Sequence, residues 1–183
     1  MSKHVEVRFT AVGGQGILLA GDILATAAID FAGLYALDSP SYTAQVRGGP
    51  TKIDVIIDEN MILFPRTTAI DCMLSLSQKS HDTFATDLKE DCKVIIDPIL
   101  VTKVDESYDV YRVPIIEMTK KEMNKMVYTS AVSLGAMVGI TDVLPVEIVR
   151  KALLKKAPRG TEDQNIKAFN LGYDAGFKLF KSN

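Results

Sequence analysis

The sequence has few of the residues that hold metal clusters. Among its 183 residues are two cysteines, Cys72 and Cys92, and two histidines, His4 and His81. Two thiols cannot supply the four ligands of an iron–sulfur cluster. The histidines are far apart in sequence and belong to no cluster with the spacing of metal ligands. We therefore expect two thiols in the core, no disulfide and no metal site.

Long apolar runs and a strong charge are also missing. No run approaches the ~20 apolar residues that cross a bilayer, so we expect no membrane contact. The formal net charge is −2. A chain without a positive field is a poor nucleic-acid binder, and we expect no such partner. The first residues, MSKHVEVRFTAVGG, contain no apolar signal core, which favours the cytoplasm.

The remaining composition is that of a globular protein. Apolar residues make up 47% and charged residues 24%. A chain of this length suits one domain, residues 1–183, and buries roughly 70% of its unfolded surface.

Strand and helix patterns alternate along the chain. Alternating or β-branched apolar segments predict strands at residues 4–12, 34–37, 52–57, 72–76, 93–96 and 110–113. Helical periodicity predicts helices at residues 17–31, 80–90, 116–126, 129–139, 146–155 and 161–181. This order predicts a three-layer α/β/α, Rossmann-like fold with a mostly parallel sheet and a helical C-terminal third.

Two helical segments have more than one interpretation. In the last helix an apolar stripe of core or subunit-interface residues is formed by Ile166, Phe169, Tyr173, Phe177 and Phe180. The segment MTKKEMNKM, Met118–Met126, is either an ordinary amphipathic helix or a surface for self-association.

A glycine-rich turn separates the first strand from the first helix. It consists of Gly13, Gly14, Gln15 and Gly16. Glycines there let backbone N–H groups approach an anion, and the helix N-terminus favours negative charge. A dinucleotide fingerprint is incomplete, because position 19 is Leu, although Asp38 stands where a ribose-binding acid is expected. The turn therefore serves packing, a phosphate or cofactor group, or NAD.

A second loop combines an aromatic ring, a cation and two glycines. Its candidate binding residues are Ser41, Tyr42, Arg47, Gly48 and Gly49. Arg47 offers a planar fork for carboxylate or phosphate, or else pairs with a nearby acid on the surface. Ligands of open α/β sheets bind beyond the carboxyl ends of the strands, so we expect this loop to form one surface with the Gly13–Gly16 turn.

These motifs together resemble the γ subunit of 2-oxoacid:ferredoxin oxidoreductases, and most closely the 2-oxoglutarate type. The resemblance rests on GGQG at 13–16, PSY at 40–42, RGG at 47–49, SLGA at 133–136 and NIKAFNLG at 165–172. It therefore covers nearly the whole chain. The Gly and Glu that the family has within the second loop are Thr43 and Gln45 here, so an ion pair made by that Glu is lost. The Asn that often precedes the Leu-Gly-Ala helix is replaced in the region of Ser130.

The resemblance implies a non-autonomous subunit with no catalytic residue of its own. Members of this family decarboxylate a 2-oxoacid oxidatively with coenzyme A and reduce ferredoxin. Thiamine diphosphate, Mg²⁺ and the iron–sulfur cluster would lie on partner subunits of the alpha, beta and delta types, and ferredoxin would be an indirect partner. An isolated chain could form a homodimer.

In that assembly we expect the chain to form part of the active-site wall and of the coenzyme A approach. The N–H groups of Gly13–Gly16 and the guanidinium of Arg47 would suit the phosphates of coenzyme A, while Ser41 and Tyr42 would contact the pantetheine arm or an adjoining chain. Related γ subunits serve pyruvate, branched-chain 2-oxoacid and indolepyruvate enzymes. Two other functions remain open, namely a stand-alone NAD(P)-binding protein and a scaffold subunit without a ligand.

Overall fold

A six-stranded sheet forms the centre of the fold. The computed structural model describes residues 4–42 and 48–182, with the backbone alone for Tyr42. The strands are β1 (His4–Val12), β2 (Tyr35–Tyr42), β3 (Pro50–Asp58), β4 (Ile70–Ser75), β5 (Leu88–Ile96) and β6 (Asp109–Arg112). They lie in the order β2-β3-β1-β4-β5-β6. The mostly parallel sheet is confirmed, since β3 alone is antiparallel to its neighbours.

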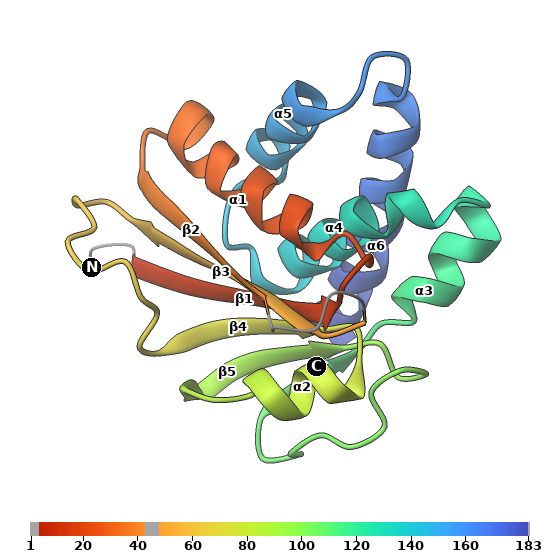
Figure 1. The fold of residues 1–183 in the computed structure, drawn as a ribbon. Helices are drawn as coiled ribbons and strands as arrows, with labels where there is room; N and C mark the ends of the chain where they lie inside the picture. Colours follow the sequence, from red (N-terminus) through yellow and green to blue (C-terminus); the bar gives the residue numbers. More distant parts are fainter. Residues whose placement is uncertain (1–3, 43–47, 183) are drawn as a thin grey trace.

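Helices cover both faces of this sheet. They are α1 (Ile17–Ala32), α2 (Gln78–Phe84), α3 (Ile115–Met118), α4 (Thr129–Thr141), α5 (Val146–Lys156) and α6 (Glu162–Ser182). A π-helical turn (Thr119–Met123) continues α3, and a 3-10 turn (Met126–Tyr128) leads into α4. Figure 1 shows α1, α4, α5 and α6 on one side of the sheet and α2 on the other. The predicted three-layer fold is therefore confirmed.

Two apolar clusters fill the space between these layers. The larger one joins β-strand residues such as Phe9 to α1, α4, α5 and α6. The smaller one, which includes Met73 and Val94, lies on the face covered by α2. Cys72 belongs to the larger cluster and Cys92 to the smaller, so the two free thiols face opposite sides of the sheet. Burial raises the pKa of each thiol to about 12, which keeps both as inert thiols, as predicted for core cysteines.

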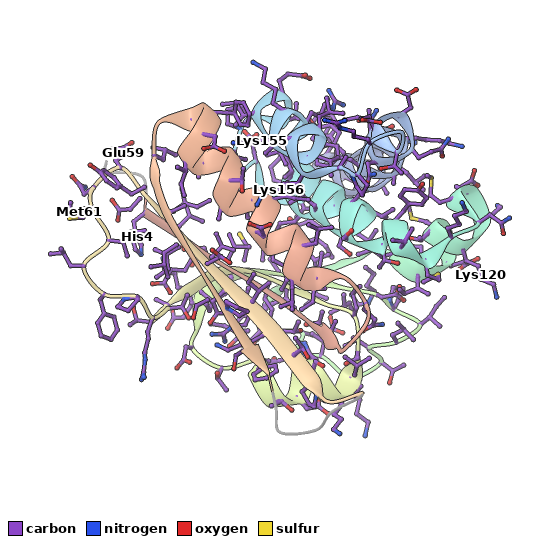
Figure 2. The ribbon with its side chains drawn as sticks, turned by 45° about the horizontal axis from the view of Figure 1, so that its top comes forward. His4, Glu59, Met61, Lys120, Lys155 and Lys156 are labelled. Atoms are coloured by element: carbon purple, nitrogen blue, oxygen red, sulfur yellow. The ribbon has the colours of Figure 1, made fainter. Side chains whose placement is uncertain are left out.

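Helices α1 and α5 are also joined at the surface. Lys155 pairs with Asp30 at 2.7 Å, and Lys156 pairs with Asp22 at 2.9 Å. Figure 2 shows both lysines on the side of α5 that faces α1.

In the part of the chain that the structure describes, no helix has the length and apolar character needed to cross a membrane.

Several predicted elements differ in extent from the observed ones. The helix predicted at residues 116–126, for example, is broken at Asn124, which takes a left-handed conformation. The strand predicted at residues 34–37 extends to Tyr42, because each residue of β2 pairs with β3 from Tyr35↔Asp58 to Tyr42↔Thr51. Pro40 is tolerated there because β2 is an edge strand. The helix predicted at residues 80–90 ends at Phe84, since Asp87 takes a left-handed conformation and β5 begins at Leu88.

Candidate functional site

The Gly13–Gly16 turn lies at the end of the sheet to which β1 points (Figure 1). Gly14 and Gly16 have φ values of 101° and 78°, which favour glycine. Gly16 is the N-cap of α1 and leaves the helix without a side-chain cap. Among the described residues, none accepts a hydrogen bond from the N–H of Gly14 or Gly16. The turn thus presents free donors at a helix N-terminus, as an anion site requires.

Gln15 braces this turn from within. Its backbone N–H bonds to the oxygen of Val12, its side-chain oxygen accepts from the Val12 N–H at 2.9 Å, and its side-chain nitrogen donates to Leu76 at 3.2 Å. Both ends of the side-chain amide are therefore used within the protein. Gln15 therefore holds the conformation of the turn, and it would contribute to ligand binding only through that conformation.

The second glycine segment meets the first. The Gly13 N–H donates to the Gly49 oxygen at 3.2 Å, and Gly48 has a φ of 67°. This contact confirms that Gly48 and Gly49 lie beside the turn. The ligand of the shared surface stays a prediction.

The other three candidate residues do not join this surface in the described part of the chain. Arg47 lies outside the described residues, and so does the side chain of Tyr42. Ser41 pairs with Lys52, and together with Arg8 these residues line a cavity of about 280 Å³. That cavity lies on the α2 face, because Arg8 donates to the Phe84 oxygen at the end of α2. Ser41 and the glycine turn are therefore on different faces of the sheet.

Arg8 and Asp54 dominate that cavity. Arg8 is 2% exposed, and its Nε and Nη2 donate to the Asp54 carboxylate at 2.7 and 3.0 Å. Its remaining donors bond to the backbone oxygens of Phe84 and Thr86 and to the hydroxyl of Thr67. Burial by itself would raise the pKa of Asp54, but the hydrogen bonds from Arg8 and Lys52 lower it. Every Arg8 donor is used inside the protein, so Arg8 itself has none left for a ligand.

The structure adds one element that the sequence analysis missed. The first turn of α4 touches the glycine turn, since a Cβ on Gly16 would lie 3.3 Å from the Cβ of Ser130. Ser130 is 3% exposed. In the sequence, the departure from the family motif near Ser130 drew attention to this residue. It did not indicate that Ser130 lies beside Gly16.

Asp38 occupies the wrong place for a dinucleotide acid. It pairs with Val55 in the middle of β2, and Val55 in turn pairs with Val7 of β1. Val7 lies five residues before Val12, roughly 17 Å from the turn at the rise of an extended strand. The ribose acid of a dinucleotide site stands at the carboxyl end of its strand. The geometry therefore disfavours NAD at the Gly13–Gly16 turn.

One side-chain pair has the form of a nucleophile and base. Ser75 Oγ lies 3.1 Å from His81 Nδ1, and the Thr10 hydroxyl donates to Ser75 Oγ at 3.0 Å. Ser75 and Thr10 are fully buried, so no substrate reaches the hydroxyl. Burial also lowers the pKa of His81 and keeps it neutral. These residues join β1, β4 and α2 by hydrogen bonds.

Comparisons with known proteins extend the motif resemblance to the whole chain. Residues 6–175 match the family model described as pyruvate ferredoxin/flavodoxin oxidoreductase. The chain belongs to this family. Within the family, it is 35% identical to the 2-oxoglutarate synthase subunit KorC of Methanocaldococcus jannaschii, over 95% of both chains. It is 25% identical to the pyruvate synthase subunit PorC of the same organism, over 96% of this chain and 99% of that one.

Solved structures agree with this assignment. The keto/oxoacid ferredoxin oxidoreductase gamma subunit of Geobacter sulfurreducens matches with a TM-score of 0.85 and 35% identity, over 95% of this chain and 99% of that one. The resemblance to γ subunits is thereby confirmed. A 2-oxoglutarate:ferredoxin oxidoreductase of Magnetococcus marinus, with 2-oxoglutarate, coenzyme A and succinyl-CoA bound, shares the fold at a TM-score of 0.80 and 22% identity. The match covers all of this chain and 32% of that longer one.

Proposed function

We propose that this chain is the γ subunit of a coenzyme A-dependent 2-oxoglutarate:ferredoxin oxidoreductase in the cytoplasm. The assignment of 2-oxoglutarate as the substrate rests on the sequence identity to two relatives from one organism. The identity is 35% to the 2-oxoglutarate synthase subunit and 25% to the pyruvate synthase subunit. Both alignments span nearly the whole chain. The difference therefore does not come from alignment length.

The chemistry of this reaction would come from partner subunits of the alpha, beta and delta types. Thiamine diphosphate with Mg²⁺ and an iron–sulfur cluster would supply carbanion and electron-transfer chemistry there. The donor set of this chain does not fit a cluster, because its two cysteines face opposite sides of the sheet. No group of three or more His, Cys, Asp or Glu side chains within residues 4–42 and 48–182 is arranged to hold a metal ion.

The contribution of this chain would be a wall of the assembled site and part of the coenzyme A approach. The free N–H groups of Gly14 and Gly16 support this role, because they are exposed at the end of β1 and at a helix N-terminus, where a phosphate is favoured. Gly48 and Gly49 lie at the same end of the sheet. A ferredoxin contact of its own is not needed for this role.

The first test is a tagged pull-down from the native host without oxygen. The co-purifying material is assayed for coenzyme A-dependent reduction of a viologen dye with 2-oxoglutarate, pyruvate and a branched-chain 2-oxoacid. We expect chains that bear thiamine diphosphate and an iron–sulfur cluster to co-purify, and the purified material to be most active on 2-oxoglutarate. Preference for another 2-oxoacid would overturn the assignment of 2-oxoglutarate as the substrate. Recovery of the chain alone without activity would overturn its role as a subunit.

A variant separates the coenzyme A approach from simple docking. Arg47→Ala in the assembled enzyme should raise the KM for coenzyme A more than that for ferredoxin, with Arg159→Ala as a control at an exposed arginine. Loss of assembly on size exclusion would assign Arg47 to subunit docking. An unchanged KM for coenzyme A in an intact assembly would show that Arg47 does not contribute to coenzyme A binding, and would favour a scaffold role for the chain.

A further inference from the structure

The segment between α3 and α4 carries a basic ridge. The ridge consists of three exposed lysines, Lys120, Lys121 and Lys125. The first two lie on the π-helical turn Thr119–Met123, and Lys125 follows the left-handed Asn124. Figure 2 shows Lys120 at the periphery of the molecule. Within the part of the chain that the structure describes, none of the three ammonium groups forms an ion pair, so their charge is available to a partner.

An acidic groove lies directly beside this ridge. It has a volume of about 430 Å³ and is lined by the carboxylates of Glu122, Asp163 and Asp174. Among residues 4–42 and 48–182, none of these carboxylates belongs to an ion pair. Lys167 is the one cation among the described residues that line the groove, and its ammonium donates to the backbone oxygen of Glu122 at 3.5 Å. Three carboxylates against one ammonium leave the groove negative.

Apolar side chains accompany both features. Met126 and Val127, which follow the ridge, are 47% and 73% exposed. Ile166 and Leu171, which are partly buried, line the groove. A contact between a ridge and a groove would therefore bury apolar surface as well as join opposite charges. Burial of apolar surface is the dominant favourable contribution to most protein association.

The ridge and the groove belong to one surface. Glu122 lines the groove and lies on the same π-helical turn as Lys120 and Lys121. A two-fold axis beside this turn would place the ridge of each chain on the groove of the other, which gives two equivalent contacts. Complementary charges of this kind steer an encounter and fix its register.

We infer that this surface is a docking site for a second copy of the chain, through a two-fold contact between the basic ridge and the acidic groove. A second copy satisfies the ridge and the groove together, whereas a basic segment of another subunit would satisfy the groove alone. The segment Met118–Met126 thereby takes the second of its two interpretations, a surface for self-association. The inference is independent of the proposed function, because both halves of the contact belong to this chain.

Analytical ultracentrifugation of the full chain is the first test. We expect the unmodified chain to form a dimer in reversible equilibrium with the monomer. Raising the salt concentration to about 1 M should weaken the dimer, because the Debye length then falls to about 3 Å. A chain that remains monomeric at about 1 mM, the weak end of protein affinities, would overturn the inference and leave the groove to another subunit.

Two charge-reversal variants test the pairing itself. Lys120→Glu/Lys121→Glu makes the ridge acidic, and Asp163→Lys/Asp174→Lys makes the groove basic. All four side chains are exposed, and Glu162 keeps an acid in the first turn of α6, so we expect both variants to fold, which circular dichroism checks. Each variant alone should dimerise roughly 100-fold more weakly, because like charges then face each other. An equimolar mixture should dimerise again, because both contacts between the two variants join opposite charges.

Leu63→Gln is the control for a different surface. Leu63 is 88% exposed on the connection between β3 and β4. Figure 2 shows its neighbour Met61 on the opposite side of the molecule from Lys120. This variant should dimerise as the unmodified chain does. Loss of the dimer in this variant, or a mixture of the two charge-reversal variants that stays monomeric, would overturn the inference.

Discussion

Ser133 carries the one buried side-chain polar atom without a hydrogen-bond partner among the residues described. We predict that Ser133→Ala raises the free energy of unfolding by about 1 kcal/mol, because it removes a desolvated hydroxyl and introduces a better helix former. Urea denaturation followed by circular dichroism measures the change.

Ser80→Ala is the opposing control for this prediction. Ser80 is equally buried, but its hydroxyl donates to the Ala11 oxygen and accepts from the Ser77 hydroxyl. Its loss should lower the free energy of unfolding by about 1–3 kcal/mol, because the partners are left unsatisfied. Destabilisation by Ser133→Ala would show that its hydroxyl has a partner after all.

The buried ion pair of Arg8 and Asp54 gives a second residue-scale prediction. Arg8→Met should lower the free energy of unfolding at pH 7 by about 3–5 kcal/mol, because it leaves a buried carboxylate with Lys52 and Thr67 as its remaining partners. The double variant Arg8→Met/Asp54→Leu should recover part of that loss. Urea denaturation of the single and double variants measures the coupling. Equal stability of the two variants would contradict it.

The contact between α4 and α6 depends on glycines in both helices. A Cβ on Gly135 would lie 2.0 Å from the Phe169 oxygen, and one on Gly172 would lie 2.0 Å from the Val132 oxygen. These atoms belong to backbone, which cannot move aside without separating the helices. The packing gives a physical reason for the Leu-Gly-Ala and Asn-x-x-Ala-Phe-x-x-Gly motifs of the sequence.

At this element scale we predict that Gly172→Ala lowers the free energy of unfolding by roughly 3 kcal/mol or more, because one methyl group forces the two helices apart. Thermal unfolding is the measurement. Lys178→Ala, on the exposed side of α6, is the control and should change stability by less than about 0.5 kcal/mol. Equal melting temperatures for the two variants would refute the role of the glycine.

The apolar stripe of α6 is buried in its first part and exposed in its last part. Phe169 is fully buried, whereas Phe177 and Phe180 are 37% and 43% exposed. The rings of Phe169, Tyr173 and Phe177 stack in succession, with centroids 6.2 and 5.7 Å apart. The first part of the stripe is core, as predicted. A subunit interface along the exposed part stays a prediction.

The stability of the whole molecule should depend on pH through its two histidines, with opposite signs. Burial lowers the pKa of His81 from 6.5, so its stabilising contribution is complete above that value and is lost as the pH falls. The hydrogen bond to Asp58 raises the pKa of His4, so its contribution is complete below 6.5 and is lost as the pH rises through the folded value. His4 lies exposed at the end of the sheet opposite the glycine turn (Figure 2), where solvent weakens its effect.

We therefore predict that His81 dominates this dependence. The unmodified chain should lose on the order of 1 kcal/mol between pH 7.5 and 5.5, and His81→Gln should lose clearly less. His4→Gln is the matched control and should keep the loss. Denaturation curves at the two pH values decide, and an equal loss in the His81→Gln variant would exclude His81 as the cause.

Local patterns in the sequence determined the elements and the turn between β1 and α1. The strand at 4–12 and the start of α1 at Ile17 were predicted as observed, and Gly33 ends α1 in a left-handed conformation. Alternation, helical periodicity and glycine act between near neighbours, so one sequence is enough to read them. The family motifs were readable for the same reason.

The tertiary structure alone decided which side chains share the site. Ser41 lies on the α2 face of the sheet, because a strand alternates its side chains and the register of β2 against β3 sets the face. Ser130 reaches Gly16 because α4 packs beside α1, a contact between residues far apart in the chain. Such contacts depend on how whole elements pack, and no local pattern near either residue encodes them.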